Sequence, residues 1–524
     1  MGHRCPPKTA VSSRRAEELA PSYAGLQEVA ASLLRERGLP WKATPGEVNE
    51  RLVRVLWQEQ RFAQGALETA DGQRLEVVSP GWWNRQSGPD FLQAVIRLGP
   101  NSVLRGDVEV HLRSSDWNAH GHARDPRYNG VILHVILTRD REVIRNQRGD
   151  RIPELELSRF LQGEIGSLQE AIHWEDYPPC DPCPPGRCQP LLVGKGRETV
   201  GWLLDLAGDD FLQRKADRWA GMVGRVGYDE LVYRGMMEAL GYRGNQLPFL
   251  QLAERLPLRG LRRALEGLPP LPATLRLQAI FFQSAGFWRN ERPDDPSLDE
   301  ATRDYLRQLE EAGAGRAEEL VDPSVPGLAW SFAGIRPANS PLRRLVGMSD
   351  FLTLHGKEGL FRSFLKDLKP ARTRGSQQRP NAQEIFRGWV ERLSPPGLSE
   401  YWSCRYAFRG KKLPSPARLI GPERAALLIV NVILPLSLLY AQRRRAPHLE
   451  EAVHGLYRAI PRLGDNGVLR FMRARLLGKA FGGRPALLAN ARRQHGLLQL
   501  YRDHCSPQGG ECQGCDFLRL VEAL

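Results

Sequence analysis

The residues best suited to chemistry gather between positions 90 and 122 of the sequence. Asp90 follows a Ser-Gly-Pro turn, and Glu109 and His111 lie two positions apart in an apolar stretch. Because side chains alternate along a strand, Glu109 and His111 share one face of it while the flanking valines share the other. If the two segments are neighbouring strands, the carboxylates of Asp90 and Glu109 can hold one Mg²⁺ or Mn²⁺ ion. Such an ion stabilises charge on a phosphate and acidifies water, so the pattern predicts phosphodiester hydrolysis.

Histidines follow directly, in the segment 114–122 (SSDWNAHGH). His120 and His122 are candidate metal ligands or phosphate contacts, and Asp116 lies one helical turn before His120. These three residues also fit a different metal hydrolase, one that acts on a small substrate. His134 lies inside an apolar stretch, where we expect a hydrogen-bonded core histidine rather than a ligand. Each acid or histidine alone could be a turn, cap or core residue; their number within so short a stretch indicates a site.

Hydrophobic periodicity places these residues in an α+β domain. We expect a helix in 47–62, strands at 75–78, 91–98 and 107–112, a short helix within 115–129, and a strand at 131–137. The order is therefore helix, three strands, helix and strand. Beyond residue 196 the patterns are mainly helical. The predicted fold class is an N-terminal domain with a mixed sheet, followed by a mainly α-helical domain.

This order of elements resembles the core of the PD-(D/E)xK nuclease superfamily. The resemblance is carried by two motifs, Pro-Asp ending at Asp90 and Glu-Val-His beginning at Glu109. It implies that Asp90 and Glu109 bind Mg²⁺ or Mn²⁺ and that His120 and His122 contact the phosphate. The implied activity is metal-dependent hydrolysis of phosphodiester bonds in DNA or RNA.

The same resemblance implies roles for residues around the metal. Glu50, or as second choice Glu59, would be the helical acid that supports the ion. His111 replaces the superfamily's lysine, and its mostly neutral imidazole would orient or deprotonate water rather than act as a fixed charge. Arg85 or Arg113 would supply the missing positive charge. This departure leaves open a non-catalytic nucleic-acid-binding protein on a nuclease-like fold.

A wider resemblance covers most of the chain. It is carried by the segments 82–91, 106–122, 131–135, 240–245 and 336–339. These segments are similar to an uncharacterised bacterial family, domain of unknown function 2851. The resemblance implies no established activity, so the functional interpretation depends on the residues themselves.

Eight cysteines occur as two single residues and two compact triplets, which indicates metal ligation rather than a disulfide framework. The C-terminal triplet, with the spacing C-x6-C-x2-C, consists of Cys505, Cys512 and Cys515. It is similar to the first three ligands of the iron–sulfur loop in endonuclease III-like glycosylases. Val521 stands where that loop has its fourth ligand, so His504 or Cys404 would have to complete a site for zinc or an iron–sulfur cluster.

The other triplet lies in a proline-rich stretch that we interpret as a hinge. It consists of Cys180, Cys183 and Cys188, with His173 as the nearest candidate for a fourth ligand. The spacing predicts a second metal site, and reduced buried thiols are the alternative for both triplets.

The chain is basic, with 74 Lys and Arg against 60 Asp and Glu, and a formal net charge of +14. Such a balance favours contact with polyanions, although a solvated basic surface has the same composition. The densest basic stretch lies within 462–493. Its candidate phosphate contacts are Arg470, Arg473, Arg475 and Lys479.

Length and composition predict several domains. We expect a loose tail and helix over 1–44, the nuclease-like domain over 45–160, a hinge over 161–194, a helical domain over 195–500, and a cysteine-containing segment over 501–524. The longest apolar run, 425–440, is shorter than a bilayer span requires and contains Asn431 and Pro435, so we expect a buried helix. We therefore expect a cytoplasmic protein without a membrane partner. Its oligomeric state is not indicated.

Overall fold

The described residues of the computed structural model form two compact units, and each is treated separately below. The first unit comprises Met1–Ala207, Asp465–Leu487 and His495–Leu524, and the second comprises Gly208–Gly464 and Leu488–Gln494. The structure describes residues 22–28, 48–84, 87–100, 102–140, 143–166, 168, 172, 185–241, 245–288, 292–313, 328, 330, 332, 335–357, 359–369, 381–478, 481, 487–505, 512 and 515–523.

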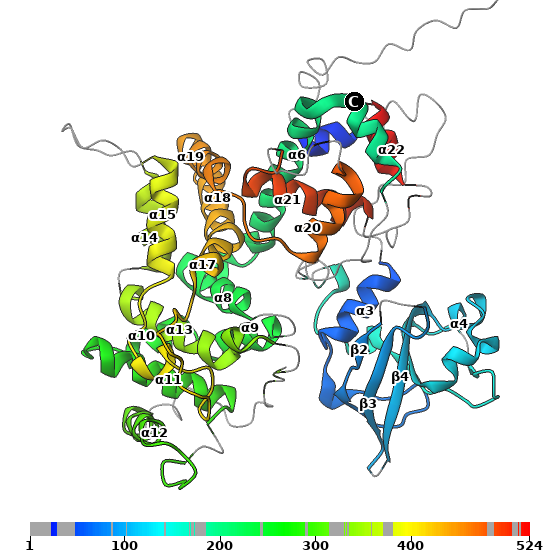
Figure 1. Ribbon diagram of the computed structural model, residues 1–524, viewed down its shortest axis with the longest axis horizontal. Coiled ribbons are helices and arrows are strands. Elements are labelled where there is room, and N and C mark those ends of the chain that lie inside the picture. Colours follow the sequence, from blue (N-terminus) through cyan, green and yellow to red (C-terminus); the bar gives the residue numbers. More distant parts are fainter. Residues whose placement is uncertain are drawn as a thin grey trace, which may run out of the picture. The chain divides into compact units, whose positions relative to one another are not determined.

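The N-terminal part of the first unit is a mixed sheet with helices beside it (Figure 1). Its strands are β1 (Leu75–Ser79), β2 (Trp82–Trp83), β3 (Phe91–Leu98), β4 (Ser102–Arg113), β5 (Val131–Thr138) and β6 (Glu154–Glu156). Its helices are α3 (Glu50–Gln58), η1 (Gln64–Ala66), α4 (Asp116–Ala119), η2 (His122–Arg124), η3 (Pro126–Gly130) and η4 (Leu157–Phe160). The predicted helix and four predicted strands are confirmed, whereas the short β2 and β6 were not foreseen.

The sheet changes from antiparallel to parallel pairing at its centre. The strand order is β1-β3-β4-β5-β6, with β2 also paired to β3. β1, β3 and β4 pair antiparallel, whereas β4, β5 and β6 pair parallel. A parallel pair cannot be joined by a tight hairpin, so the chain crosses from β4 to β5 through α4, η2 and η3. This crossover carries the histidines that the sequence analysis singled out.

The two faces of β4 have the different characters that the alternation predicts. Val108 and Val110 are fully buried apolar residues on one face, and Glu109 and His111 lie on the other. Helix α3 contacts β4 and β5. Burial of the α3 residue Leu52 and its neighbours anchors this helix, and with it the polar residues of its first turns, beside the sheet.

Among its described residues, the rest of the first unit is mainly helical. It contains the beginning of α6 (Cys188–Ala220), then α20 (Gly467–Met472), η8 (Arg473–Leu477), the end of α21 (Ala491–Leu500), η9 (Tyr501–Cys505) and α22 (Asp516–Ala523). Gly196 has a φ of 84°, and the helical geometry of α6 is interrupted there. Just before α6, the backbone N–H of Gly186 donates to Arg475 O in η8, so segments far apart in the sequence lie together there.

The second unit consists of helices around one large apolar core. After the end of α6 they are α7 (Val223–Val226), α8 (Tyr228–Leu240), α9 (Gln246–Arg255), α10 (Leu258–Ala264), α11 (Pro270–Ala285), α12 (Glu300–Gly313), η6 (Pro337–Asn339), α13 (Pro341–His355), α14 (Leu360–Leu368), α15 (Ala382–Leu393), α16 (Glu400–Ser403), α17 (Pro422–Leu428), η7 (Ile429–Ile433), α18 (Leu434–Arg443) and α19 (Pro447–Ala459). With the sheet of the first unit, they confirm the predicted α+β class.

One helix of the second unit is long and apolar enough to cross a membrane by length and composition alone. It runs continuously over Pro422–Arg443, and 78% of its most apolar window is buried within the structure. The expectation of a buried helix around residues 425–440 is confirmed.

Candidate metal and active site

Strand β4 supplies the first two residues of the candidate site. Glu109 and His111 are 3% and 0% exposed, and both lie on the face of β4 opposite the valines. In the register of the parallel pair, Glu109 is opposite His134 on β5. The sheet therefore holds the carboxylate of Glu109 and the imidazole of His134 at fixed positions on adjacent strands, as a preorganised site requires.

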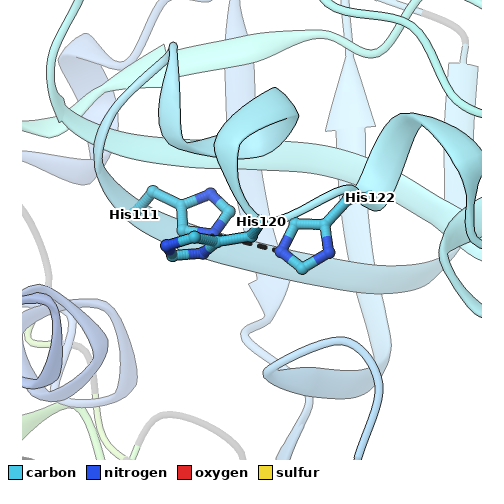
Figure 2. A group of neighbouring side chains, drawn as sticks. All are labelled: His111, His120 and His122. Carbon is cyan, nitrogen blue, oxygen red and sulfur yellow. Dashed lines mark hydrogen bonds between the residues drawn. The ribbon is translucent and has the colours of Figure 1, made fainter.

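The crossover after β4 folds two further histidines back onto this face. Ser115, before α4, donates its backbone N–H and its hydroxyl to Asp140. Trp117 is fully buried on the inner side of α4. Gly121 then takes a left-handed φ of 79°, which reverses the chain between His120 and His122. The rings of His111, His120 and His122 consequently point toward one another (Figure 2).

The donor atoms in this group have the spacing of ligands around one ion. His111 Nε2 lies 3.1 Å from His120 Nδ1 and 3.3 Å from His122 Nε2. Glu109 Oε1 lies 3.2 Å from His122 Nε2 and 3.5 Å from His111 Nε2. A tetrahedral ion with metal–nitrogen bonds of about 2.0–2.1 Å separates its ligand atoms by roughly 3.3 Å. His111 Nε2 therefore lies at this spacing from both other histidines, the three histidines could hold one ion, and Glu109 Oε1 is a candidate fourth donor.

A chain of hydrogen bonds determines which nitrogen of His111 faces the group. Glu154 on β6 accepts a hydrogen bond from His134 Nδ1 at 3.0 Å, because a carboxylate can only accept. His134 Nε2 then carries a lone pair and accepts from His111 Nδ1 at 2.8 Å. His111 Nε2 is left with its lone pair directed at His120 and His122. Metal-binding histidines are commonly held in this way, with the second ring nitrogen donating to an outer acceptor.

The neighbouring carboxylates are engaged with a guanidinium. Asp90 Oδ2 accepts a hydrogen bond from the backbone N–H of Val110 at 3.1 Å, and Arg54 Nε lies 2.8 Å from the same oxygen. Arg54, on α3, also pairs with Glu50 one turn earlier. Glu109 Oε2 accepts from the backbone N–H of Asp90 at 3.0 Å, which leaves Oε1 facing the histidines. Asp90 and Glu109 are therefore neighbours, as expected, but Asp90 is paired with Arg54.

Burial shifts the pKa values of the buried side chains around the site. It raises the pKa of Glu109 to about 8 and raises that of Asp90 well above its usual range, although Arg54 opposes both shifts. It lowers the pKa values of His111, His122 and His134, so these rings are neutral. Neutral imidazoles with available lone pairs are the form that binds metal ions.

Tyr128 closes one side of the group. Its ring stacks on His122 with the ring centroids 3.8 Å apart. Burial, together with the charges of Glu109 and Asp90, raises the pKa of the Tyr128 phenol to about 12. Exposure is unequal around the group, since His120 is exposed while His111 and His122 are buried. A ligand can therefore approach from the side of His120.

The family model described as Protein of unknown function (DUF2851) matches residues 50–466 of this chain. The chain belongs to this family. No curated protein and no solved structure matches it. Membership confirms the wider resemblance found in the sequence, and the matched range includes Glu50, Asp90 and Glu109 as well as the three histidines.

The other predicted residues of this domain have different surroundings. Asp116 Oδ2 accepts a hydrogen bond from the backbone N–H of Arg113 at 2.8 Å, so Asp116 organises the turn before α4. His111 is the residue that converges with His120 and His122. Glu59, the second choice for the helical acid, is buried and paired with Arg61. Arg113 is exposed at the end of β4.

Several predicted residues fall outside the described part of the chain. They are Arg85, His173, Cys180, Cys183 and Lys479. Their expected roles stay predictions.

The predicted basic surface is only partly present. Arg470 is exposed, and Arg473 pairs with Asp465 at 2.8 Å. Arg475 is only 5% exposed and donates a hydrogen bond to Cys512 Sγ at 2.9 Å. The guanidinium of Arg475 is therefore buried within the first unit, which does not favour the expected contact with a phosphate backbone.

Sequence reasoning missed three residues of the site: Arg54, Tyr128 and Glu154. Glu154 lies on a three-residue strand that no periodicity marks. Arg54 is one turn after Glu50 on an amphipathic helix, so a salt-bridge pattern was visible there. Its contact with Asp90 joins residues from different elements and carries no local signal.

Proposed function

We propose that this protein is a metal-dependent hydrolase of phosphodiester bonds in nucleic acid. One observation carries the proposal. Three imidazole nitrogens lie within 4.8 Å of one another, a carboxylate oxygen lies 3.2 Å from one of them, and an outer carboxylate orients the buried ring. The strand order and the positions of Asp90 and Glu109 support a nuclease-like reaction over other metal-dependent ones.

The donor set favours a borderline cation. Imidazole ligands suit zinc, iron, cobalt and nickel, whereas Mg²⁺ prefers oxygen ligands in octahedral geometry. A site with three histidines and one glutamate therefore fits Zn²⁺ better than Mg²⁺, while its carboxylate also suits Mn²⁺. A cation held there supplies positive charge to a phosphate oxygen and acidifies water.

The remaining side chains have roles that their contacts suggest. Asp90 holds the backbone of Val110 and the guanidinium of Arg54, so it positions rather than binds. Arg54 keeps 30% of its side chain exposed and can donate to a phosphate. The surplus of basic residues in the chain supports a polyanionic substrate.

A cleavage assay tests this function. The full chain is incubated with labelled single- and double-stranded DNA and RNA in the presence of Mn²⁺, Zn²⁺, Co²⁺ or Mg²⁺, with a chelator as blank. We expect cleavage with Mn²⁺ or Zn²⁺, and its loss in Glu109→Gln and His120→Ala. His448→Ala is the matched control, because His448 is likewise exposed but lies in the second unit. A well-folded protein that cuts none of these substrates with any cation contradicts the proposal.

The Arg54–Asp90 pair favours a second candidate, a nucleic-acid-binding protein without catalysis. A guanidinium beside Asp90 and Glu50 already balances carboxylates that would otherwise attract a cation. This candidate predicts salt-sensitive binding that survives Asp90→Ala combined with Glu109→Ala, and no cleavage with any metal. Hydrolysis of a small phosphodiester such as bis(p-nitrophenyl) phosphate, without cleavage of polynucleotides, would favour a small substrate instead.

A further inference from the structure

Four cysteines from opposite ends of the chain lie in the first unit. Cys188 is the first residue of α6, Cys505 ends η9, and Cys515 precedes α22; these three are 5%, 7% and 9% exposed. Cys512 is half-buried, and all four are free thiols. The sequence analysis had placed Cys188 in a separate triplet and had left the fourth ligand of the C-terminal triplet to His504 or Cys404.

Contacts around Arg475 connect the two segments. The backbone N–H of Gly186 donates to Arg475 O at 2.9 Å, and Arg475 Nη2 donates to Cys512 Sγ at 2.9 Å. The backbone N–H of Arg187 also approaches Cys512 Sγ, at 3.5 Å. A Cβ added to Gly186 would lie 3.2 Å from Cys188 Sγ. The turn before α6 is thus packed directly against the loop that carries Cys512.

The other two thiols share this environment. Cys505 and Cys515 are both buried. The ring of His504, next to Cys505, lies beside Phe517, two residues after Cys515, so η9 and the start of α22 are packed together. Backbone N–H groups of residues 517 and 518 donate to the Cys515 sulfur.

The previously considered fourth ligands have other surroundings. His504 Nε2 lies 2.9 Å from the hydroxyl of Tyr23, and its ring lies beside Phe517. Cys404 belongs to the second unit. Cys188, in the turn that packs against Cys512, is thus the candidate for the fourth ligand beside Cys505, Cys512 and Cys515.

We propose that Cys188, Cys505, Cys512 and Cys515 bind a thiophilic metal centre, either one zinc ion or an iron–sulfur cluster. Four thiolates are the ligand set of structural zinc and of iron–sulfur clusters alike. Metal binding releases the thiol protons, and the buried Arg475 guanidinium then hydrogen-bonds a thiolate. Hydrogen bonds from backbone N–H groups to a ligand sulfur support the same state. The centre would fasten α22 and η9 to the start of α6.

Metal analysis of the full chain, purified without added metal and under exclusion of oxygen, tests this site. We expect one equivalent of zinc, or iron with acid-labile sulfide and visible absorption, lost in Cys512→Ala and Cys188→Ala. Cys404→Ala is the control, because Cys404 is also buried but lies in the second unit. Retention of the metal in both ligand variants, or its loss in the control, overturns the proposal.

A second measurement needs no variant and guards against misfolding. A mercurial reagent is added stepwise to the native protein while a chromophoric chelator reports released zinc or iron. We expect release to require modification of the thiols, and native protein that releases no metal overturns the proposal.

This site is independent of the histidine site. His120→Ala should therefore leave the thiol-bound metal in place, even if the proposed hydrolase activity proves wrong.

Discussion

Glu154 offers the sharpest test of the histidine site, because it touches no proposed ligand. It is 4% exposed, its Oε1 holds His134 at 3.0 Å, and His134 in turn holds the ligand His111 at 2.8 Å. Replacing Glu154 by alanine leaves all three proposed imidazole ligands and Glu109 intact. Glu154 Oε2 also lies 3.6 Å from Arg139 Nε, and the two hydrogen bonds are the path that connects Glu154 to the ligand His111.

The expected loss can be worked out from these contacts. Without Glu154, either ring nitrogen of His134 could carry the proton. This change alone would lower the metal affinity only about twofold, roughly 0.4 kcal/mol. The larger part comes from the lost carboxylate, which orients the His134–His111 pair and makes the facing nitrogen of His111 more basic. Outer partners of this kind are worth about 10- to 100-fold in metal affinity, or about 1.4–2.7 kcal/mol. Glu154→Gln, which still accepts from His134, should lose less.

Competition for Mn²⁺ against a chromophoric chelator measures this affinity. Mn²⁺ is chosen because thiolates select softer metals, so the cysteine site does not interfere. The control is Glu156→Ala on the same strand, whose carboxylate accepts from the backbone N–H of Arg139. If Glu154→Ala binds Mn²⁺ as tightly as the wild type, or if both variants lose affinity equally, the inferred orientation of His111 is wrong. Thermal unfolding of each variant verifies that it is folded.

Three further predictions concern protonation and backbone geometry. Because burial raises the pKa of Glu109 to about 8, metal affinity should increase as pH rises toward 8, and Glu109→Gln should remove this dependence in a binding titration. Asp350, buried in the second unit, has a pKa raised by burial from 3.8 to about 6, so its contribution to stability is complete below about pH 4 and is lost as pH rises through 6. In wild type the free energy of unfolding in urea should therefore fall by about 3 kcal/mol more between these pH values than in Asp350→Asn. Gly121→Ala should destabilise the domain by about 1–2 kcal/mol and weaken Mn²⁺ binding, because its φ of 79° is unfavourable for alanine; unchanged melting and binding would contradict this.

The fold of the N-terminal domain was predictable where local patterns determine it. Alternation along β4 placed Glu109 and His111 on one face, and the structure has them there. The apolar strand β5 and the amphipathic α3 were equally visible. The strand β6 was not, because three residues carry too little periodicity to be recognised.

The site itself depends on contacts that no local pattern encodes. His111 was interpreted as a substitute for lysine, whereas the left-handed turn at Gly121 makes it the centre of a histidine group. The His-Gly-His sequence was the one available sign of that turn, since glycine readily adopts positive φ. In the same way, the contact of the Arg187 backbone N–H with Cys512 Sγ joins residues 325 positions apart, and sequence spacing alone favoured two separate triplets.

The contacts of Arg54 and His111 explain together how such a site could work without the lysine. In the motif that the sequence resembles, one fixed positive charge stands on the strand beside the acids. Under the proposed function the fixed charge would come from the neighbouring helix, where Arg54 is paired with Asp90 and Glu50. That pairing engages Asp90 but leaves Glu109 Oε1 facing the histidines. Under the proposed function the cation therefore lies on the histidine side of Glu109, and the preference for metals should shift from Mg²⁺ toward ions that bind imidazole.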